Sequence, residues 1–284
     1  MSCHNGIGNM KIMMSAGFLR LKLTLYSCAP LYVLAVFCVY LVYSVYVLIV
    51  SGHAQMLTVT SGILYITTQS SIYYLLYTPA MVVLLSGLID LGMFEIMFFS
   101  RANSRKNYVM NKFLAILGFT IICVASMVVI AFFVYRCVEN PDIQWQQHCL
   151  FMNQTGMQIV NTNLLGVSGC VLIAAQAVLL IFSFLVLGLL MLLMQNIFTK
   201  KFVSVIIPLC ISLLVYLLST CDLPDWLMNI LPNSYLFLPH FSSINHFLTA
   251  GIYWLAILLV LLLGVILTTK YKDIMYEDYE KQMY

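Results

Sequence analysis

Charged residues are scarce in this chain of 284 residues: Asp, Glu, Lys and Arg make up 8% of it, whereas hydrophobic residues make up 63%. A soluble domain has about 25% charged residues and about half apolar ones. A chain with so few polar groups cannot cover the surface of a water-soluble globule. The composition therefore excludes a soluble enzyme, a nucleic-acid-binding protein and a disordered tail. It predicts a protein that is embedded in a lipid bilayer.

Sequence motifs for catalysis and cofactor binding are also missing. The chain has no glycine-rich phosphate loop (GxxxxGK[ST]), no HExxH zinc helix and no GxSxG nucleophile elbow. Its nine cysteines form no CxxC pair. Four histidines, His53, His148, His240 and His246, come from separate loops without metal-ligand spacing, so we expect ordinary surface residues. We therefore expect no catalytic residue, no metal and no cofactor on this chain.

Uninterrupted apolar runs of about 20 residues match the hydrocarbon core of a bilayer. We predict an all-α polytopic membrane protein that forms a single transmembrane domain with six spans. The spans are residues 31–50, 72–91, 113–135, 164–194, 203–218 and 247–267. The fourth run would be about 46 Å long as a helix, so we expect it to tilt or to project into water. The fairly apolar residues 56–68 are expected outside the membrane, at its interface.

The lysines and arginines are distributed unequally between the two sides of this topology. Only Arg136 falls on one side. The other side holds Lys11, Arg20, Lys22, Arg101, Arg105, Lys106, Lys112, Lys200, Lys201, Lys270, Lys272 and Lys281. Because cytoplasmic loops carry the excess of basic residues, both termini are expected in the cytosol. Residues 10–26 are expected to form an interfacial helix; the alternative is a disordered basic lead-in.

Two connecting segments are not simple polar loops. Residues 94–112, on the cytosolic side, combine apolar side chains such as Phe98 and Phe99 with four cations. An exposed apolar face of this kind favours a partner surface; the alternative is a short helix that rests on lipid headgroups. Residues 221–246, on the outer side, place prolines among Trp, Tyr and Phe. Proline interrupts a continuous helix, so we expect a short helical insertion at the outer interface before the last span.

The order and sidedness of these segments resemble the type-2 ABC exporter permeases, over essentially the whole chain. In that family the loop between the second and third spans is a coupling helix that docks into an ATPase. In this loop the match is carried by Glu95, Ser104, Arg105 and Lys112, which stand where the family's acid, serine–arginine pair and pre-span lysine fall. If the segment docks on an ATPase, Phe98 and Phe99 would supply apolar contact, and Arg101, Arg105 and Lys106 would meet acidic groups. The residues expected to couple to the ATPase are therefore Glu95, Phe98, Phe99, Arg101, Ser104, Arg105 and Lys106. The resemblance also implies the plasma membrane of a bacterial cell. The outer loop over residues 136–162 is longer than the family's usual turn. The finer resemblance is to permeases of bacteriocin or lantibiotic immunity and of small-peptide efflux.

The resemblance also implies partners. ATP would be bound by a separate ABC ATPase subunit, and a second permease chain, identical or different, would complete the pathway. The expected substrate is a hydrophobic peptide or a lipid-like molecule, exported by alternating access. Two other functions stay open: a non-transporting scaffold or sensor subunit, and a membrane-embedded enzyme. The enzyme would need paired acids, a Ser–His pair or a set of zinc ligands at membrane depth, and the sequence shows no such pattern.

Three further residues are candidates for specific contacts. Cys137 and Cys149 share one outer loop, where oxidation is permitted, and a bridge between them could add about 3 kcal/mol of stability. The alternatives are chance co-location and pairing with Cys221. Gln176 lies inside the fourth apolar run, where it either bonds to a neighbouring helix or lines a cavity, the first being favoured.

Overall fold

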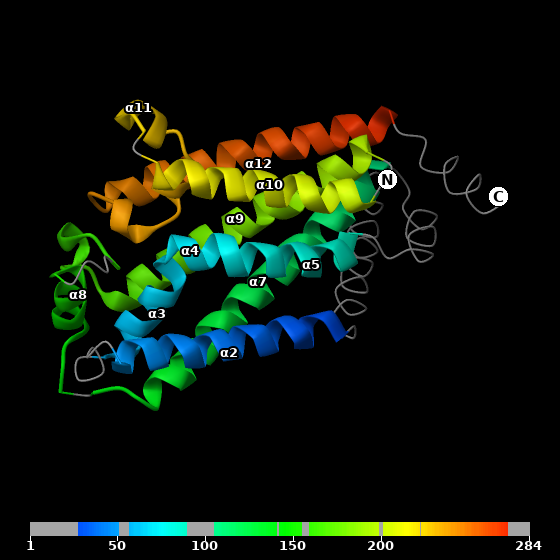
Figure 1. The fold of residues 1–284 in the computed structure, drawn as a ribbon. Coiled ribbons are helices and arrows are strands. Elements are labelled where there is room, and N and C mark those ends of the chain that lie inside the picture. Colours follow the sequence, from blue (N-terminus) through cyan, green and yellow to red (C-terminus); the bar gives the residue numbers. More distant parts are fainter. Residues whose placement is uncertain are drawn as a thin grey trace, which may run out of the picture.

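The described part of the chain is helical. The computed structural model describes residues 28–50, 57–89, 105–140, 142–154, 159–198, 201–221 and 223–271, and all regular structure within these ranges consists of helices. The longest helices run roughly along one direction (Figure 1). The predicted interfacial helix over residues 10–26 lies outside the described residues. The all-α class predicted from the sequence is confirmed for the described ranges.

Within the described ranges, five helical segments are long and apolar enough to cross a bilayer, which indicates a membrane-embedded protein. They are α4–η2–α5 (Ser70–Ile72, Tyr73–Tyr77 and Thr78–Ile89), α7 (Arg105–Arg136), α9 (Gly169–Ile197), α10 (Lys201–Thr220) and α12 (Asn245–Tyr271). The first predicted span lies in another long helix, α2 (Cys28–Val50), which has 23 residues and no charged side chain.

Two helix boundaries differ from the predicted spans. Helix α7 begins at Arg105, eight residues before the predicted span, so its first turns carry basic residues. Helix α9 begins at Gly169, five residues after the predicted start. The residues before it form the short 3-10 helix η3 (Thr162–Leu164), which Asn161 caps through its side chain. Both differences arise because the limits of an apolar run do not determine the residues at which a helix begins and ends.

Helix α3 (Val59–Thr68) covers most of the segment that we expected at the membrane interface, and it is packed inside the bundle. Eight of its ten residues are buried, and the helix packs against α7, α8 (Trp145–Gln154) and α9. Thr58 and Ser61 form a capping box at its start, which satisfies the first backbone N–H groups. A short apolar helix has the same composition whether it lies on lipid or inside a bundle, and packing places this one inside.

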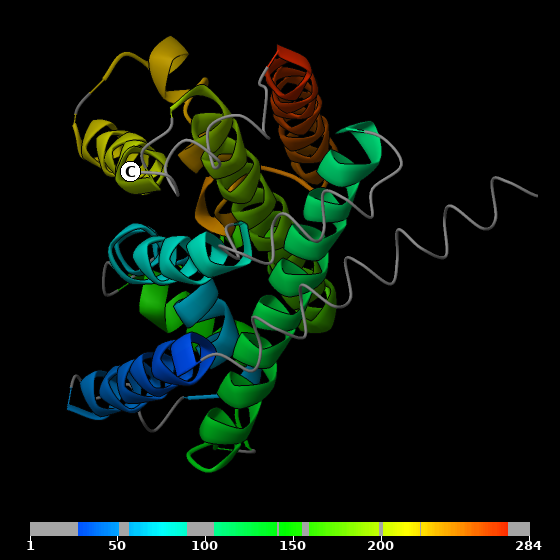
Figure 2. The ribbon, with the colours of Figure 1, turned by 90° about the vertical axis from the view of Figure 1, so that its right-hand side faces the viewer.

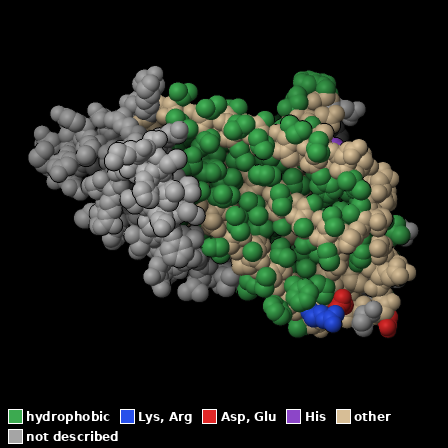
Figure 3. Space-filling model, turned by 180° about the vertical axis from the view of Figure 1, so that it is seen from behind, with side chains coloured by type: hydrophobic (Ala, Val, Ile, Leu, Met, Phe, Trp, Pro, Cys, Tyr) green, Lys and Arg blue, Asp and Glu red, His purple; other side chains and the backbone are tan. Residues whose placement is uncertain are grey.

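Helix α9 is the centre of the bundle. It contacts α3, α5, α7, α10 and α12, and Figure 2 shows it passing between its neighbours. The surrounding helices expose large apolar side chains instead of polar ones; examples are Phe133 on α7, Leu217 on α10 and Leu248 on α12. The face drawn in Figure 3 is mostly hydrophobic, and its visible charged side chains gather at one end. This surface is suited to contact with lipid tails.

The two ends of the bundle are chemically different. We define the basic end as the one where α2, α7 and α10 begin and where α5, α9 and α12 end (Figure 1). Arg105 and Lys201 are the first residues of α7 and α10, and Lys270 lies in the last turn of α12. The opposite end, here the far end, carries the short helices α8, η3, α11 (Asp225–Met228), η4 (Pro232–Tyr235) and η5 (Leu238–His240). Arg136 ends α7 there.

A close contact between α3 and α7 provides a test of this packing. A Cβ atom added to Gly62 would lie 2.6 Å from ring carbons of Tyr135. The ring cannot easily move, because Tyr135 is fully buried and its hydroxyl lies 3.0 Å from Ser44 Oγ. We expect Gly62→Ala to destabilise the protein by about 1–3 kcal/mol, measured as a lower Tm in detergent.

Gly87→Ala is the matched control. Nothing lies within 4 Å of a Cβ at Gly87, which is in helix α5, so alanine there should be neutral or stabilise by up to about 1 kcal/mol. Equal Tm values for the Gly62→Ala and wild-type proteins would contradict the packing of α3 against Tyr135.

Candidate functional site

The chain leaves helical geometry once between α3 and α5, at Gln69, where the backbone is extended (φ −74°, ψ 111°). We call this point the helix break. Helix α4 follows directly, and then the π-helix η2 over Tyr73–Tyr77. A break and a π-turn in one membrane helix are typical of functional sites. They also leave backbone carbonyls without their usual partners, and hydrocarbon supplies none.

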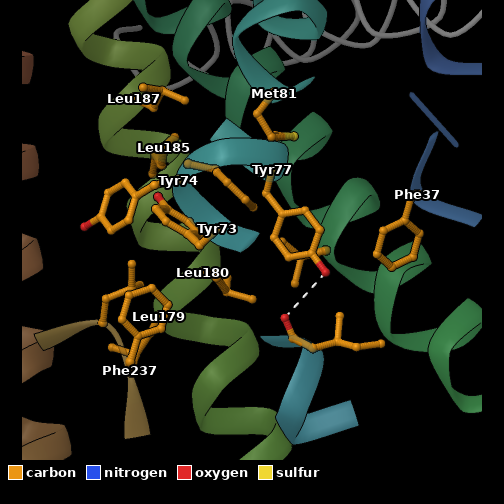
Figure 4. Close-up of a cluster of buried hydrophobic side chains, with 14 of the residues drawn as sticks. Phe37, Tyr73, Tyr74, Tyr77, Met81, Leu179, Leu180, Leu185, Leu187 and Phe237 are labelled. Carbon is orange, nitrogen blue, oxygen red and sulfur yellow. Dashed lines mark hydrogen bonds between the residues drawn. The ribbon is translucent and has the colours of Figure 1, made fainter. Parts of the chain in front are cut away.

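Side chains from elsewhere satisfy the carbonyls before the helix break. The Tyr77 hydroxyl donates a hydrogen bond of 3.5 Å to the Ile66 carbonyl, drawn as the dashed line in Figure 4. Gln176 Nε2, from α9, donates to the Thr67 carbonyl at 3.1 Å and to the Leu236 carbonyl at 3.1 Å. Gln176 is fully buried. Of the two interpretations of this residue, bonding to neighbouring segments is the one that the structure shows.

An aromatic cluster surrounds the π-helix (Figure 4). Tyr73 stacks on Phe184 of α9 at 5.5 Å between ring centroids, and its hydroxyl is hydrogen-bonded to Ser183. Phe237 meets the Tyr73 ring edge-on at 5.6 Å and approaches Tyr74 at 6.3 Å. Phe237 is 1% exposed. The outer insertion, residues 221–246, therefore does more than cover the far end, because its central residues enter the bundle.

The basic end, in contrast, contains a cavity of about 490 Å³ between α5, α9 and α10, which we call the basic-end cavity. Its lining residues are Ser86, Gly87, Ile89, Met191, Gln195, Phe202, Ser204 and Val205. Ligand sites typically have volumes of about 300–1,000 Å³, with mostly apolar walls and a few polar groups. The size and the lining of this cavity fit that description.

The structure locates only part of the predicted coupling segment. Glu95, Phe98, Phe99, Arg101 and Ser104 lie outside the described residues. Arg105 and Lys106 form the start of α7, at the basic end. The two described members are thus at the same end of the bundle as the basic-end cavity.

His148 is not the surface residue that the sequence led us to expect. Its side chain is fully buried, and its Nδ1 lies 2.5 Å from Ser61 Oγ. A serine beside a histidine supplies two of the three residues of a hydrolytic triad. However, Ser61 is also fully buried, and its hydroxyl donates to the Thr58 carbonyl at 3.0 Å. The pair therefore anchors α8 to the start of α3. It does not present a nucleophile to a substrate.

The residues that the structure describes contain no group of three or more His, Cys, Asp or Glu side chains that could hold a metal ion. Sequence reasoning missed the Ser61–His148 contact because 87 positions separate the two residues. Thr58 and Ser61 form the capping box at the start of α3, which is a local feature and does not indicate the contact with His148.

The bridge considered between Cys137 and Cys149 is not formed. Both are free cysteines; Cys137 is exposed, whereas Cys149 is buried inside α8. Burial raises the pKa of the Cys149 thiol to about 12, so almost no reactive thiolate exists at neutral pH. Cys221 is also free and exposed.

We expect maleimide at pH 7 to label Cys137 and Cys221 of the folded protein without prior reduction, and to label Cys149 only after denaturation. Peptide mass spectrometry of labelled protein measures all three sites at once. A non-reduced peptide that links Cys137 to Cys149 would contradict this arrangement of the far end.

Comparisons with known proteins identify no relative. No protein family, no curated protein and no solved structure matches this chain. A function for it therefore has to be inferred from the site and from the fold that positions it.

Proposed function

We propose that this chain is the transmembrane permease subunit of an ATP-driven ABC exporter. The observation that carries the proposal is the asymmetry of the bundle. At the far end the central residues of the outer insertion, Leu236 to Leu238, are buried between the helices, whereas the basic end contains a cavity. A bundle that is closed at one end and hollow at the other has the form of one state of an alternating-access cycle.

The basic residues support the orientation of this state. The positive-inside rule assigns the basic end to the cytosol, with both termini on that side and α2 as a sixth span beside the five long apolar helices. Arg136, the cation of the far end, is paired with Glu139. In this orientation the basic-end cavity lies at the cytosolic side, where the substrate of an exporter is collected. The membrane is the bacterial plasma membrane in this proposal.

The walls of the cavity favour an amphipathic substrate. Ile89, Met191 and Phe202 supply apolar surface. The polar groups in the lining are the Ser86 and Ser204 hydroxyls and the Gln195 amide. No Asp, Glu, Lys or Arg is among the described lining residues, which favours a hydrophobic peptide or a lipid-like molecule over an ion.

Energy has to come from a partner in this proposal, since the sequence has no phosphate-binding loop. A separate ABC ATPase would dock on residues 94–112, at the end that contains the cavity. A second permease chain would complete the pathway. The alternative, a non-transporting scaffold or sensor subunit, requires neither a cavity nor nucleotide turnover.

Arg105→Glu tests the docking of the ATPase. Reversing the charge at a partly desolvated interface turns an attraction into a repulsion that can cost several kcal/mol. We expect normal abundance in the membrane but loss of ATPase co-purification. Arg136→Glu, at the far end, is the matched control and should retain the ATPase. If the Arg105→Glu protein retained its ATPase and transported normally, the coupling assignment would be wrong and the helical fold would stand.

Gly87→Trp tests the basic-end cavity as the substrate site. The position lines the cavity and a Cβ there meets no atom within 4 Å, so the indole should fill the cavity without displacing α5. We expect at least tenfold slower transport of a fluorescently labelled hydrophobic peptide in proteoliposomes that contain the ATPase. Gly251→Trp on α12 is the control, because its Cβ position is equally open and Gly251 is not in the lining.

The comparison of these two variants separates three results. Slow transport with Gly87→Trp alone supports the cavity as the route. Equal transport by both variants and by the wild type would exclude it. A wild-type complex that binds the ATPase but transports no peptide would favour the scaffold alternative.

A further inference from the structure

One buried side chain connects two segments that are far apart in the sequence. Gln176 Nε2 donates to the Thr67 carbonyl, two residues before the helix break, and to the Leu236 carbonyl in the outer insertion. Each bond is 3.1 Å long, and Gln176 is fully buried in the first third of α9 (Gly169–Ile197). The amide thus lies at the junction of three elements.

The packing around the amide joins the same segments. Leu236, Phe237 and Leu238 of the outer insertion are all buried. The Phe237 ring lies against Tyr73 and Tyr74 of the π-helix (Figure 4). The outer insertion therefore contacts the broken helix directly as well as through Gln176.

The other side of the outer insertion is held by α12. Trp254 Nε1 donates to the Tyr235 carbonyl at 2.9 Å, and the Tyr253 hydroxyl donates to the Ile230 carbonyl at 3.0 Å. These two bonds do not involve the helix break. They provide a way to loosen the outer insertion through residues of α12.

Withdrawal of the outer insertion would leave one Gln176 donor without its partner in an apolar interior, and unsatisfied buried groups are costly there. The amide would follow the Leu236 carbonyl or find a new acceptor, and either movement disturbs its bond to Thr67. We propose that Gln176 is a latch that makes the outer insertion and the helix break open and close as one unit. Opening of the far end is then coupled to a change of conformation at Gln69. This proposal does not depend on an ATPase partner.

Hydrogen–deuterium exchange of the full-length protein in lipid nanodiscs tests the latch through a double-mutant design. Trp254→Phe removes one hydrogen bond from the outer insertion and preserves the aromatic packing. With Gln176 present, we expect amides of residues 232–241 and of residues 66–77 to exchange faster together, on the order of tenfold. In a Gln176→Leu background, the same Trp254→Phe change should accelerate only residues 232–241.

Two results would overturn the proposal. One is that Trp254→Phe leaves residues 66–77 unchanged although Gln176 is present. The other is that it accelerates them equally with glutamine or leucine at position 176, since coupling would then pass through packing alone. If the Gln176→Leu protein does not fold, unchanged exchange of residues 66–77 in the Trp254→Phe protein still overturns the proposal.

Discussion

Lipid tails offer no hydrogen-bond partner to a peptide group, and this constraint organises the structure. The helix break at Gln69 would place free carbonyls in hydrocarbon if nothing met them. Gln176 and Tyr77 supply the donors, and they can do so because α9 and the π-helix lie beside the end of α3. The central position of α9, the burial of α3 and the entry of the outer insertion into the bundle all follow from the need to enclose this polar backbone in protein.

The same constraint explains the contrast between the two ends. At the far end, buried contacts of the outer insertion close the bundle over the aromatic cluster. At the basic end, α5, α9 and α10 leave a cavity with apolar walls and a few polar groups. A protein that needed only to rest in the membrane would gain from close packing at both ends. The proposed transport function uses this asymmetry, since alternating access requires a bundle whose two ends can differ.

The features that were predictable from the sequence depend on long segments. The apolar runs located five helices that can cross a bilayer, because a membrane-sized run of this kind has few other uses. The single amide in the fourth run marked Gln176 as a candidate for hydrogen bonding. Its partners were not predictable, because backbone carbonyls carry no sequence signal. The interior position of α3 was missed for a related reason. A ten-residue apolar helix has a similar composition in a protein core and at a membrane interface.

Contacts between distant side chains were the least accessible to sequence reasoning. Spacing in a loop suggested a bridge between Cys137 and Cys149, but spacing does not say that one of them faces the interior of the bundle. We expected a surface residue at His148 because the four histidines come from separate loops without metal-ligand spacing. It is instead hydrogen-bonded to Ser61, 87 positions away. The proposed coupling role of residues 95–104 depends on the family resemblance, and it falls outside the described residues.

The outward face of α12 gives the most direct test of the central claim that this bundle is surrounded by lipid. Leu248, Ile252, Leu255, Leu259, Leu263 and Leu267 are all more than half exposed in the structure. Spin labels at these six positions in proteoliposomes report accessibility to oxygen, which concentrates in hydrocarbon, and to a water-soluble nickel chelate. We predict oxygen accessibility that is greatest near Leu259 and falls toward both ends, with the opposite profile for nickel. High nickel accessibility at all six positions would show that α12 faces water, and would contradict the membrane-embedded fold.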